Sequence, residues 1–173
     1  MIILITRDEA IQLLEENGCA PNVIEHCKEV ASLAVEMANK AIAAGHKVNL
    51  EMVEIGALLH DFGRCKTHKI DHAAEGYRLA KNIGIDSEIS EIIKRHIGAG
   101  ISKEEARKLG LPEDDYFPRS LEEKIVAHAD NLVKGTRRIT TTERIALMRK
   151  QEVPEIVIQR VNKLAEEVER LFS

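Results

Sequence analysis

The chain of 173 residues is long enough for one well-buried domain and short for two. Its 44% hydrophobic and 31% charged residues are ordinary for a globular protein. A net charge of -4 and an aromatic content of 3% argue against a general attraction to nucleic acid or anionic lipid and against a base-stacking surface. We therefore expect one domain over residues 1–173, with no membrane partner and no strong nucleic-acid signal.

The cysteines and the amino-terminal residues indicate the cellular compartment in which the protein is expected. Cys19, Cys27 and Cys65 form no Cys-X-X-Cys pair and are odd in number, which disfavours a disulfide framework and a cysteine zinc site. The apolar residues 1–5 are followed at once by charged residues, and they are too few for a signal-peptide core or a membrane span. Both observations favour a cytoplasmic protein.

Two helices are predicted in the first 44 residues. Thr6 and Glu9 have the spacing of a capping box, and the helix that they open is expected to end near residues 17–18. A longer helix is predicted from residue 21 to about residue 44. His26 shares the apolar side of this second helix, so its ring is expected to point into the interior.

The next predicted helix is apolar nearly all round. Asn49 is a suitable cap, and the apolar residues Met52, Val53, Ile55, Ala57, Leu58 and Leu59 indicate a central, buried helix. The helix ends in His60 and Asp61, which lie side by side. Burying such an ionisable pair is costly unless each member is hydrogen-bonded, paired with a charge or bound to a metal. The pair therefore requires partners from elsewhere in the chain.

Further helices are predicted downstream, each carrying a polar side chain toward the interior. Four of them are expected to begin at Asp71, Ser87, Ser102 and Ser120. Ser102 and Ser120 have the spacing of capping boxes with Glu105 and Glu123. A helical hairpin is expected over residues 140–172. His72, His96 and Asp130 lie on or beside the apolar faces of these helices. No alternating strand pattern is present, so the predicted class is all-α.

The histidines and aspartates predicted to point inward suggest a metal site. Imidazole and carboxylate ligands together suit iron, manganese, cobalt, nickel or zinc, and one or two ions are expected. A single histidine on an apolar face is more often a hydrogen-bonded core residue. Several buried polar groups in one small core are harder to explain in that way.

His26, the adjacent His60-Asp61 and the later Asp130 match, in order and helical context, the metal-binding signature of the HD-domain superfamily of metal-dependent phosphohydrolases. Residues 60–63, His-Asp-Phe-Gly, resemble the HDIG variant of this signature, with Phe62 in place of isoleucine. The chain resembles small stand-alone HDIG-type proteins of archaea over about residues 20–135. The resemblance implies an HD-domain helical bundle, here with a C-terminal helical hairpin. A GYP motif is missing from the expected region, which disfavours hydrolysis of cyclic dinucleotides.

The resemblance also implies a set of metal ligands. His26, His60, Asp61 and Asp130 would hold one ion. His72 and His96 would hold a second ion with Asp61 as a bridge, as in bacterial HD hydrolases that cleave diadenosine tetraphosphate. Alternatively, His72 only occupies a helix entrance. His46, His68 and His128 are expected to be non-ligands, and Cys27 a small core residue.

Basic residues near these ligands are candidates for phosphate binding. Arg64 and Lys66 are expected to act beside Asp61 in catalysis because the chain holds them close to the ligands. The full set of phosphate-binding candidates is Arg64, Lys66, Lys69, Arg95, Lys134, Arg137 and Arg138. For each of them the alternative is a solvated charge or a cation at a helix C-terminus.

Three functions are compatible with this sequence. The first is hydrolysis of a phosphoester or phosphoanhydride of a nucleotide, a dinucleotide polyphosphate or another small phosphorylated molecule by metal-activated water. The second is an oxygenase with two irons, and the third is a non-catalytic nucleotide-binding regulatory module. The apolar hairpin could pack on its own core or form an oligomer face.

Overall fold

The computed structural model describes residues 5–173, so residues 1–4 of the apolar amino-terminal run lie outside the described part. In chain order the helices are α1 (Arg7–Glu16), α2 (Pro21–Ala43), α3 (Leu50–Leu59), the 3₁₀ helix η1 (Phe62–Cys65), α4 (His72–Asn82), α5 (Ser87–Lys94), α6 (Lys103–Lys108), α7 (Leu121–Asn131), α8 (Thr141–Lys150) and α9 (Glu155–Arg170). The predicted all-α class is confirmed. A small two-stranded sheet, β1 (Val133–Lys134) and β2 (Arg137–Arg138), was not predicted.

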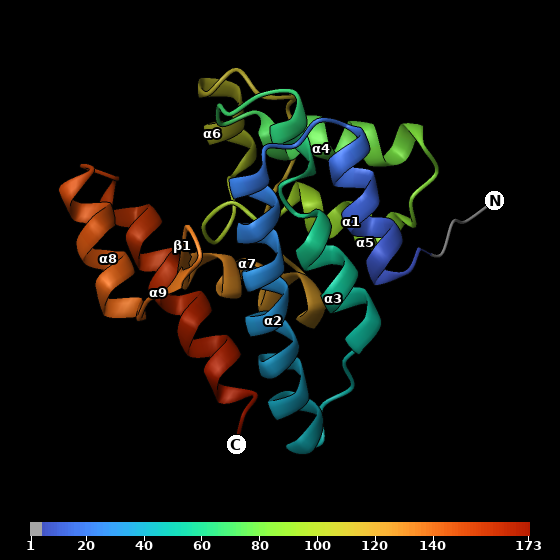
Figure 1. Cartoon of the computed structure of the whole chain (residues 1–173). Helices are drawn as coiled ribbons and strands as arrows, with labels where there is room; N and C mark the ends of the chain where they lie inside the picture. The colour runs from blue at the N-terminus through green and yellow to red at the C-terminus, as the bar shows by residue number, and fades with distance from the viewer. Residues whose placement is uncertain (1–4) are drawn as a thin grey trace.

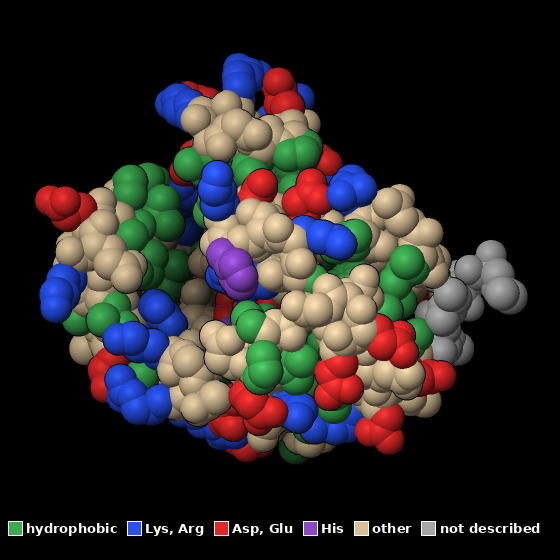
Figure 2. All heavy atoms as spheres, turned by 45° about the horizontal axis from the view of Figure 1, so that its top comes forward, with side chains coloured by type: hydrophobic (Ala, Val, Ile, Leu, Met, Phe, Trp, Pro, Cys, Tyr) green, Lys and Arg blue, Asp and Glu red, His purple; other side chains and the backbone are tan. Residues whose placement is uncertain are grey.

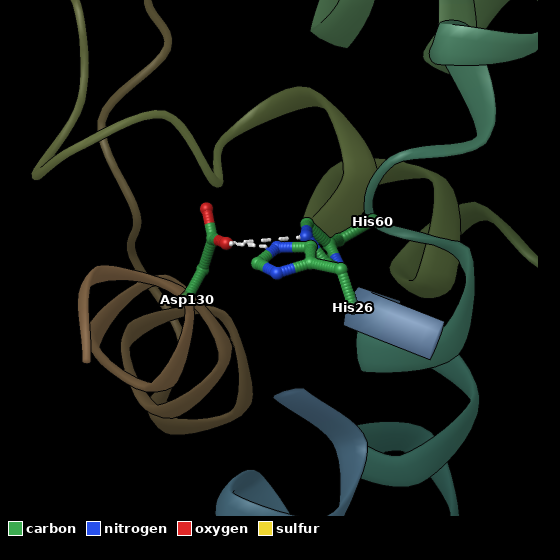
Figure 3. Close-up of side chains that lie close together, drawn as sticks. All are labelled: His26, His60 and Asp130. Atoms are coloured by element: carbon green, nitrogen blue, oxygen red, sulfur yellow. Dashed lines mark hydrogen bonds and ion pairs between the residues drawn. The ribbon is translucent and has the colours of Figure 1, made fainter. Parts of the chain in front are cut away.

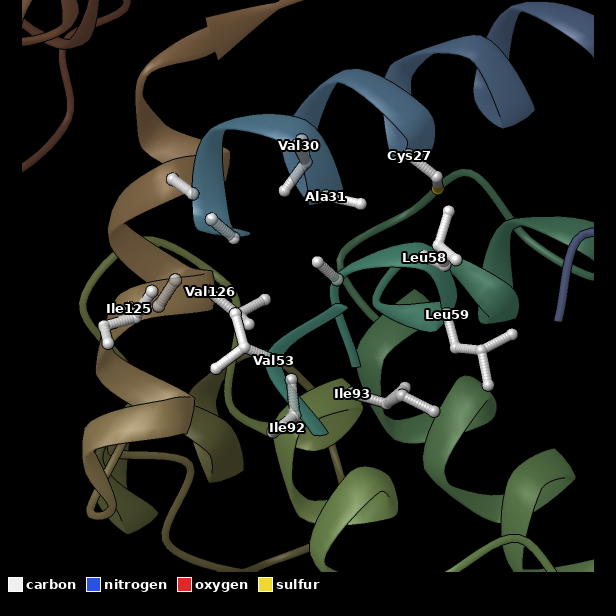
Figure 4. Packing of buried hydrophobic residues seen from close by; sticks show 14 of the residues in the cluster. Cys27, Val30, Ala31, Val53, Leu58, Leu59, Ile92, Ile93, Ile125 and Val126 are labelled. Carbon is white, nitrogen blue, oxygen red and sulfur yellow. The ribbon is translucent and has the colours of Figure 1, made fainter. Parts of the chain in front are cut away.

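Helix α3 lies at the centre of the fold, in contact with α1, α2, α5 and α7 (Figure 1). Its side chains Val53, Leu58 and Leu59 are fully buried, and they lie among residues such as Val30 of α2 and Val126 of α7 (Figure 4). Full burial of one such side chain contributes about 1.5–3 kcal/mol. The end of α3 is therefore held firmly from several sides, as expected for a central helix.

The predicted helix starts are mostly reproduced. The capping boxes at Thr6 and Ser102 are confirmed. At Ser120 only half of the predicted box forms: its side chain accepts from the Glu123 backbone N–H at 3.1 Å. The Glu123 carboxylate instead accepts from the backbone N–H of Arg119 at 2.8 Å. The prediction of a full capping box at Ser120 was therefore wrong, because the Glu123 carboxylate has other partners.

The backbones of η1 and α4 touch at two glycines. A Cβ atom at Gly63 would overlap the carbonyl oxygen of His72, and a Cβ atom at Gly76 would lie 2.8 Å from the backbone nitrogen of Gly63. Only residues without side chains allow this approach. The contact fixes the start of α4, and with it His72, beside the turn that follows Asp61.

The C-terminal helices α8 and α9 form the predicted helical hairpin, which projects from one side of the molecule (Figure 1). Helix α9 packs on α7, and α8 packs on α9. The sheet β1–β2 lies in the connection between α7 and α8, with Val133 paired to Arg138 and Lys134 to Arg137. Strands of two residues are too short to show an alternating sequence pattern, which explains why this sheet was missed.

A disulfide joins Cys19, in the connection between α1 and α2, to Cys65 at the end of η1. The expectation against disulfides was therefore wrong for this pair. An odd number of cysteines does not exclude a single bridge, and the fold brings together two residues that are 46 positions apart. Cys27 remains a buried thiol. Among the described residues, no helix is both long and apolar enough to cross a membrane.

Candidate metal centre

The first group of converging side chains consists of His26 from α2, His60 at the C-terminal end of α3 and Asp130 from α7. Asp130 Oδ1 lies 2.9 Å from His26 Nε2 and 3.3 Å from His60 Nε2 (Figure 3). His60 is fully buried, whereas His26 and Asp130 are partly exposed. Three helices that are distant in sequence thus bring one carboxylate and two imidazoles to a common point.

The second group consists of Asp61, His72 and His96, all of which are buried. His72 and His96 bring their Nε2 atoms to 3.1 Å from each other. Each of these nitrogens lies 3.4 Å from Asp61 Oδ1. His96 follows the last turn of α5, and His72 opens α4. His72 therefore lies both at the entrance to α4 and within this cluster.

Asp61 lies between the two groups, and its two oxygens face different partners. Oδ1 faces His72 and His96, whereas Oδ2 lies 3.5 Å from His60 Nε2 and 3.8 Å from His26 Nε2. A carboxylate in this position is able to bind a different ion with each oxygen. The six side chains expected from the sequence as ligands therefore lie together in two adjoining groups.

Each histidine presents Nε2 to the centre because its Nδ1 is engaged elsewhere. His60, His72 and His96 donate from Nδ1 to the carbonyl oxygens of Ala57, Lys69 and Ile93. His26 donates from Nδ1 to the carbonyl oxygen of Gly135 at 2.7 Å. A carbonyl oxygen only accepts, so the proton of each neutral ring is on Nδ1 and the lone pair is on Nε2. This arrangement is typical of metal-binding histidines.

The donor set fits a divalent metal ion. Among the described residues, the buried Nε2 of His60 has no hydrogen-bond partner. When both rings are neutral with the proton on Nδ1, His72 and His96 direct two lone pairs at each other and at Asp61, an arrangement that repels unless a cation or a proton lies between them. Imidazole nitrogens and carboxylate oxygens suit the transition metals named from the sequence.

The carboxylates and imidazoles of the group shift one another's pKa values, and although burial favours the neutral form of His60, its neighbours Asp61 and Asp130 hold its pKa well above its ordinary value. Burial opposes the charged form of Asp61, but His60, His72 and His96 outweigh burial and hold the pKa of Asp61 well below its ordinary value. Desolvation likewise opposes the charged form of Asp130, but His60 and His26 keep its pKa far below the ordinary value. Burial lowers the pKa of His96. At neutral pH the centre therefore offers two carboxylates and an unprotonated imidazole.

Cys27 lies close to the centre without being an expected ligand. Its sulfur is within 4.8 Å of the ligand atoms of His60 and Asp61. Burial raises the pKa of the Cys27 thiol, so the neutral form is favoured. The structure thus places Cys27 in the core, in line with the expectation that it is a small core residue, but nearer to the ligands than its sequence position indicated.

A cavity of about 470 Å³ opens onto His26 and Asp61. Its remaining lining residues are Asn22, Val23, Arg64, His68, Gly135 and Thr136. Figure 2 shows this face of the molecule, with a histidine side chain at the edge of a recess and charged side chains of both signs around it. The sequence did not indicate that Asn22, His68 and Thr136 line this cavity. The position of Asn22 one helical turn before His26 was the one available signal.

The structure brings some predicted phosphate-binding residues to the cavity and not others. Arg64 lines it, with Nε at 3.2 Å from Asp61 Oδ1. Arg95 is buried between Glu91 and Glu123, at 2.9 and 3.2 Å. Lys66, Lys69, Lys134 and Arg137 are exposed, and Arg138 is bound to glutamates of α2. Arg64 is therefore the predicted cation that the fold places beside the ligands.

Comparison with known proteins gives the family. The HD domain family matches this chain over residues 23–135, which include all six converging side chains. The chain belongs to the HD domain family. The first residue of that range is one turn before His26, and the last is Gly135, the hydrogen-bond partner of His26. The matched range therefore includes the ligands and ends at the residue whose carbonyl oxygen orients His26.

Relatives of this HD domain protein include the uncharacterized protein MJ0778 of Methanocaldococcus jannaschii, which is 49% identical over 76% of this chain and 78% of its own length. The tRNA (cytidine(56)-2'-O)-methyltransferase of Thermoplasma volcanium is 42% identical over 89% of this chain, but the match spans only 44% of the methyltransferase. Ribonuclease Y of Symbiobacterium thermophilum is 32% identical over 76% of this chain and 22% of its own length. The chain therefore spans less than half of these two longer relatives.

A solved structure has the same fold. It is the HD domain of the Listeria monocytogenes phosphodiesterase PgpH in complex with cyclic-di-AMP. It superposes with a TM-score of 0.56 over 92% of this chain and 93% of that chain, at 17% sequence identity. At this identity the likeness establishes the shared HD-domain fold.

Proposed function

We propose that this HD domain protein hydrolyses a phosphoester or phosphoanhydride with the help of one or two divalent metal ions. His26, His60, Asp61 and Asp130 would hold the first ion, and His72 and His96, with Asp61 as a bridge, the second. The observation that carries the proposal is the position of Asp61, whose two oxygens face the two histidine groups. The proposed substrate is a nucleotide or another small phosphorylated molecule, for which the cavity of about 470 Å³ has room.

A bound divalent ion would lower the pKa of a water molecule toward about 7 and neutralise charge that develops on phosphoryl oxygens. The chain's own residues would position the substrate. Arg64 is partly exposed at the cavity, and its guanidinium is suited to a phosphoryl oxygen. Lys66 would add positive charge near the same turn. Asn22 and Thr136 offer further hydrogen-bonding groups in the lining of the cavity.

The proposal is tested by replacing Asp61. Asp61→Ala should lower bound metal and reduce turnover of the best substrate in a panel of nucleotides by at least about 100-fold, because both ions lose a ligand. Asp8→Ala, which removes an exposed carboxylate of α1, is the matched control and should leave both unchanged. Full metal content and turnover in Asp61→Ala would contradict the site assignment.

The number of ions has its own experiment. His72→Ala and His96→Ala should each remove one ion per chain while the other remains, since both rings bring Nε2 to Asp61 Oδ1, on the side of the carboxylate away from His26 and Asp130. Metal analysis of the purified variants measures this directly. Unchanged metal content in both variants would reduce the centre to one ion.

An RNA substrate is the second candidate, and it is favoured by the relatives. Ribonuclease Y and the tRNA methyltransferase are both named for reactions on RNA, and their matches overlap the HD region of this chain. The panel should therefore include short RNA strands with and without terminal phosphates. Methyl transfer to tRNA is the reaction named for the relative from Thermoplasma volcanium. A parallel assay with S-adenosylmethionine and tRNA tests whether this chain shares it.

The two other functions expected from the sequence are separated by the same preparation. An oxygenase would consume oxygen with an organic substrate when loaded with iron. A regulatory module would bind nucleotide without turnover across several divalent metals. Phosphate release that depends on Asp61 would exclude both as the main function.

A further inference from the structure

The four histidines of the centre are oriented in two different ways. His60, His72 and His96 each donate from Nδ1 to the carbonyl oxygen three residues earlier, so each ring is fixed by its own stretch of chain. His26 donates instead to the carbonyl oxygen of Gly135, which is 109 residues away in sequence. The orientation of His26 therefore depends on how the segment that carries Gly135 is held.

Gly135 lies in the turn between β1 and β2, with φ of 64°. The sheet has two residues in each strand. An isolated hairpin is at best marginally stable in water, and one this short has still fewer hydrogen bonds. Contacts from elsewhere in the fold must therefore keep the turn against His26.

Val133 of β1 is buried in the core, and two arginines add polar contacts, one on each side of the turn. Arg144 of α8 donates to the carbonyl oxygens of Asn131 and Val133, at 2.5 and 3.3 Å, and so holds the approach to β1. Arg138 holds β2 to helix α2. Its Nε lies 2.6 Å from one oxygen of Glu29, and its two terminal nitrogens lie 2.7 and 2.8 Å from the two oxygens of Glu36.

The glutamates that bind Arg138 share a face of α2 with His26. Glu29 is one turn beyond His26, and Glu36 is two turns beyond Glu29. The two parallel hydrogen bonds to Glu36 restrict the guanidinium in direction as well as in distance. The same helix therefore carries both the ligand and the anchor of the segment that orients this ligand.

The carbonyl of Gly135 matters because of what lies on the other side of the ring. Asp130 Oδ1 is 2.9 Å from His26 Nε2. Without an acceptor at Nδ1, a neutral ring would place its proton on Nε2, where Asp130 accepts it. The nitrogen that should bind the metal would then carry a proton.

We propose that Arg138 is a positioning residue for the metal centre: by fixing β2 to Glu29 and Glu36 it keeps the Gly135 carbonyl on Nδ1 of His26 and leaves Nε2 free for a metal ion. The inference rests on the proposed function of the centre. The proposal also predicts different effects on the two groups of ligands. Loss of Arg138 should disturb the group of His26, His60 and Asp130, whereas the group of His72 and His96 is oriented locally.

The experiment uses the full chain, freed of metal and titrated with Co²⁺, with binding followed by visible absorption and calorimetry. Arg138→Ala should weaken one of two Co²⁺ sites by about 10–100-fold, the usual effect of losing a group that orients a metal ligand, and leave the other site unchanged. Glu36→Ala should have the same effect, and Arg138→Lys a smaller one. Arg137→Ala is the matched control, because this neighbour in β2 is exposed and lies 3.7 Å from Glu143 of α8. It should bind Co²⁺ as the unchanged chain does.

Nitrogen chemical shifts of His26 in the metal-free protein give an independent measurement. The proton should be on Nδ1 in the unchanged chain and in Arg137→Ala, and it should move toward Nε2 in Arg138→Ala. Binding within twofold at both sites with an unmoved proton would overturn the inference, and so would equal weakening at both sites. If the unchanged chain bound no Co²⁺, the proposed function would fail, while the chemical shifts would still decide the role of Arg138.

Discussion

His128 shows how a single residue near the centre can affect the pH dependence of stability. It is buried in α7, and among the described residues neither ring nitrogen has a hydrogen-bond partner. Burial lowers the pKa of His128 to about 4 from an ordinary value of 6.5. The unfolded chain therefore takes up a proton at this residue between these two pH values while the folded chain does not, so stability falls as the pH is lowered.

We expect His128→Leu to remove this part of the pH dependence. The unchanged protein should lose on the order of 2–3 kcal/mol more than the variant when the pH falls from about 6.5 to about 4, since each pKa unit corresponds to about 1.4 kcal/mol. Urea unfolding across this range measures the difference. Parallel curves for the two proteins would show that His128 is protonated as readily in the folded state as in the unfolded state.

At the residue scale, the sequence predicted which side chains meet but not all of the groups that orient them. His26, His60, Asp61 and Asp130 stand out because helical spacing directs each toward an apolar interior. The Gly135 carbonyl leaves no such signal, since every residue has a backbone oxygen. The acidic partners of Arg95 and Arg138 were also missed, because most of them come from other helices.

At the scale of elements, the contact between η1 and α4 sets the position of His72. We expect Gly63→Ala to lower the free energy of unfolding by about 3 kcal/mol or more and to lower metal content. The added Cβ would overlap backbone atoms of His72 and Gly76, and these atoms can move only if helix α4 moves as a whole. Gly110→Ala is a control with a positive φ of 74° and open space around it, and it should cost only about 1 kcal/mol. Thermal unfolding and metal analysis measure both effects. A Gly63→Ala variant as stable as Gly110→Ala would mean that the two backbones separate easily.

Helix positions were predictable from capping residues and apolar spacing, whereas the details of some caps were not. Asp71 occupies the N-cap position of α4, yet its side chain accepts from the Thr67 hydroxyl at 2.9 Å rather than from the helix. Glu123 likewise binds Arg95 and Arg119. A polar side chain with several partners within reach is assigned by the tertiary structure, which local sequence does not contain.

At the scale of the whole molecule, the Cys19–Cys65 disulfide links the entrance of α2 to the turn that follows Asp61. The bridge closes a loop of 46 positions. Closing such a loop in the unfolded chain corresponds to about 2–4 kcal/mol of stability. We expect a reductant to lower the stability of the unchanged protein to that of the Cys19→Ser/Cys65→Ser variant, and to leave the variant unaffected. Urea unfolding with and without reductant measures this, and a reductant-insensitive unchanged protein would refute it.

The different sequence spans of the two ligand groups have a consequence for the order in which the centre forms during synthesis. Asp61, His72 and His96 all lie within residues 61–96, so this group can close while the rest of the chain is still being made. His26 and Asp130 are separated by 104 residues, and the larger loop has the higher entropic cost of closure. A newly made chain therefore has Asp61, His72 and His96 available to a metal ion before α7 and the Gly135 turn exist to complete the other group.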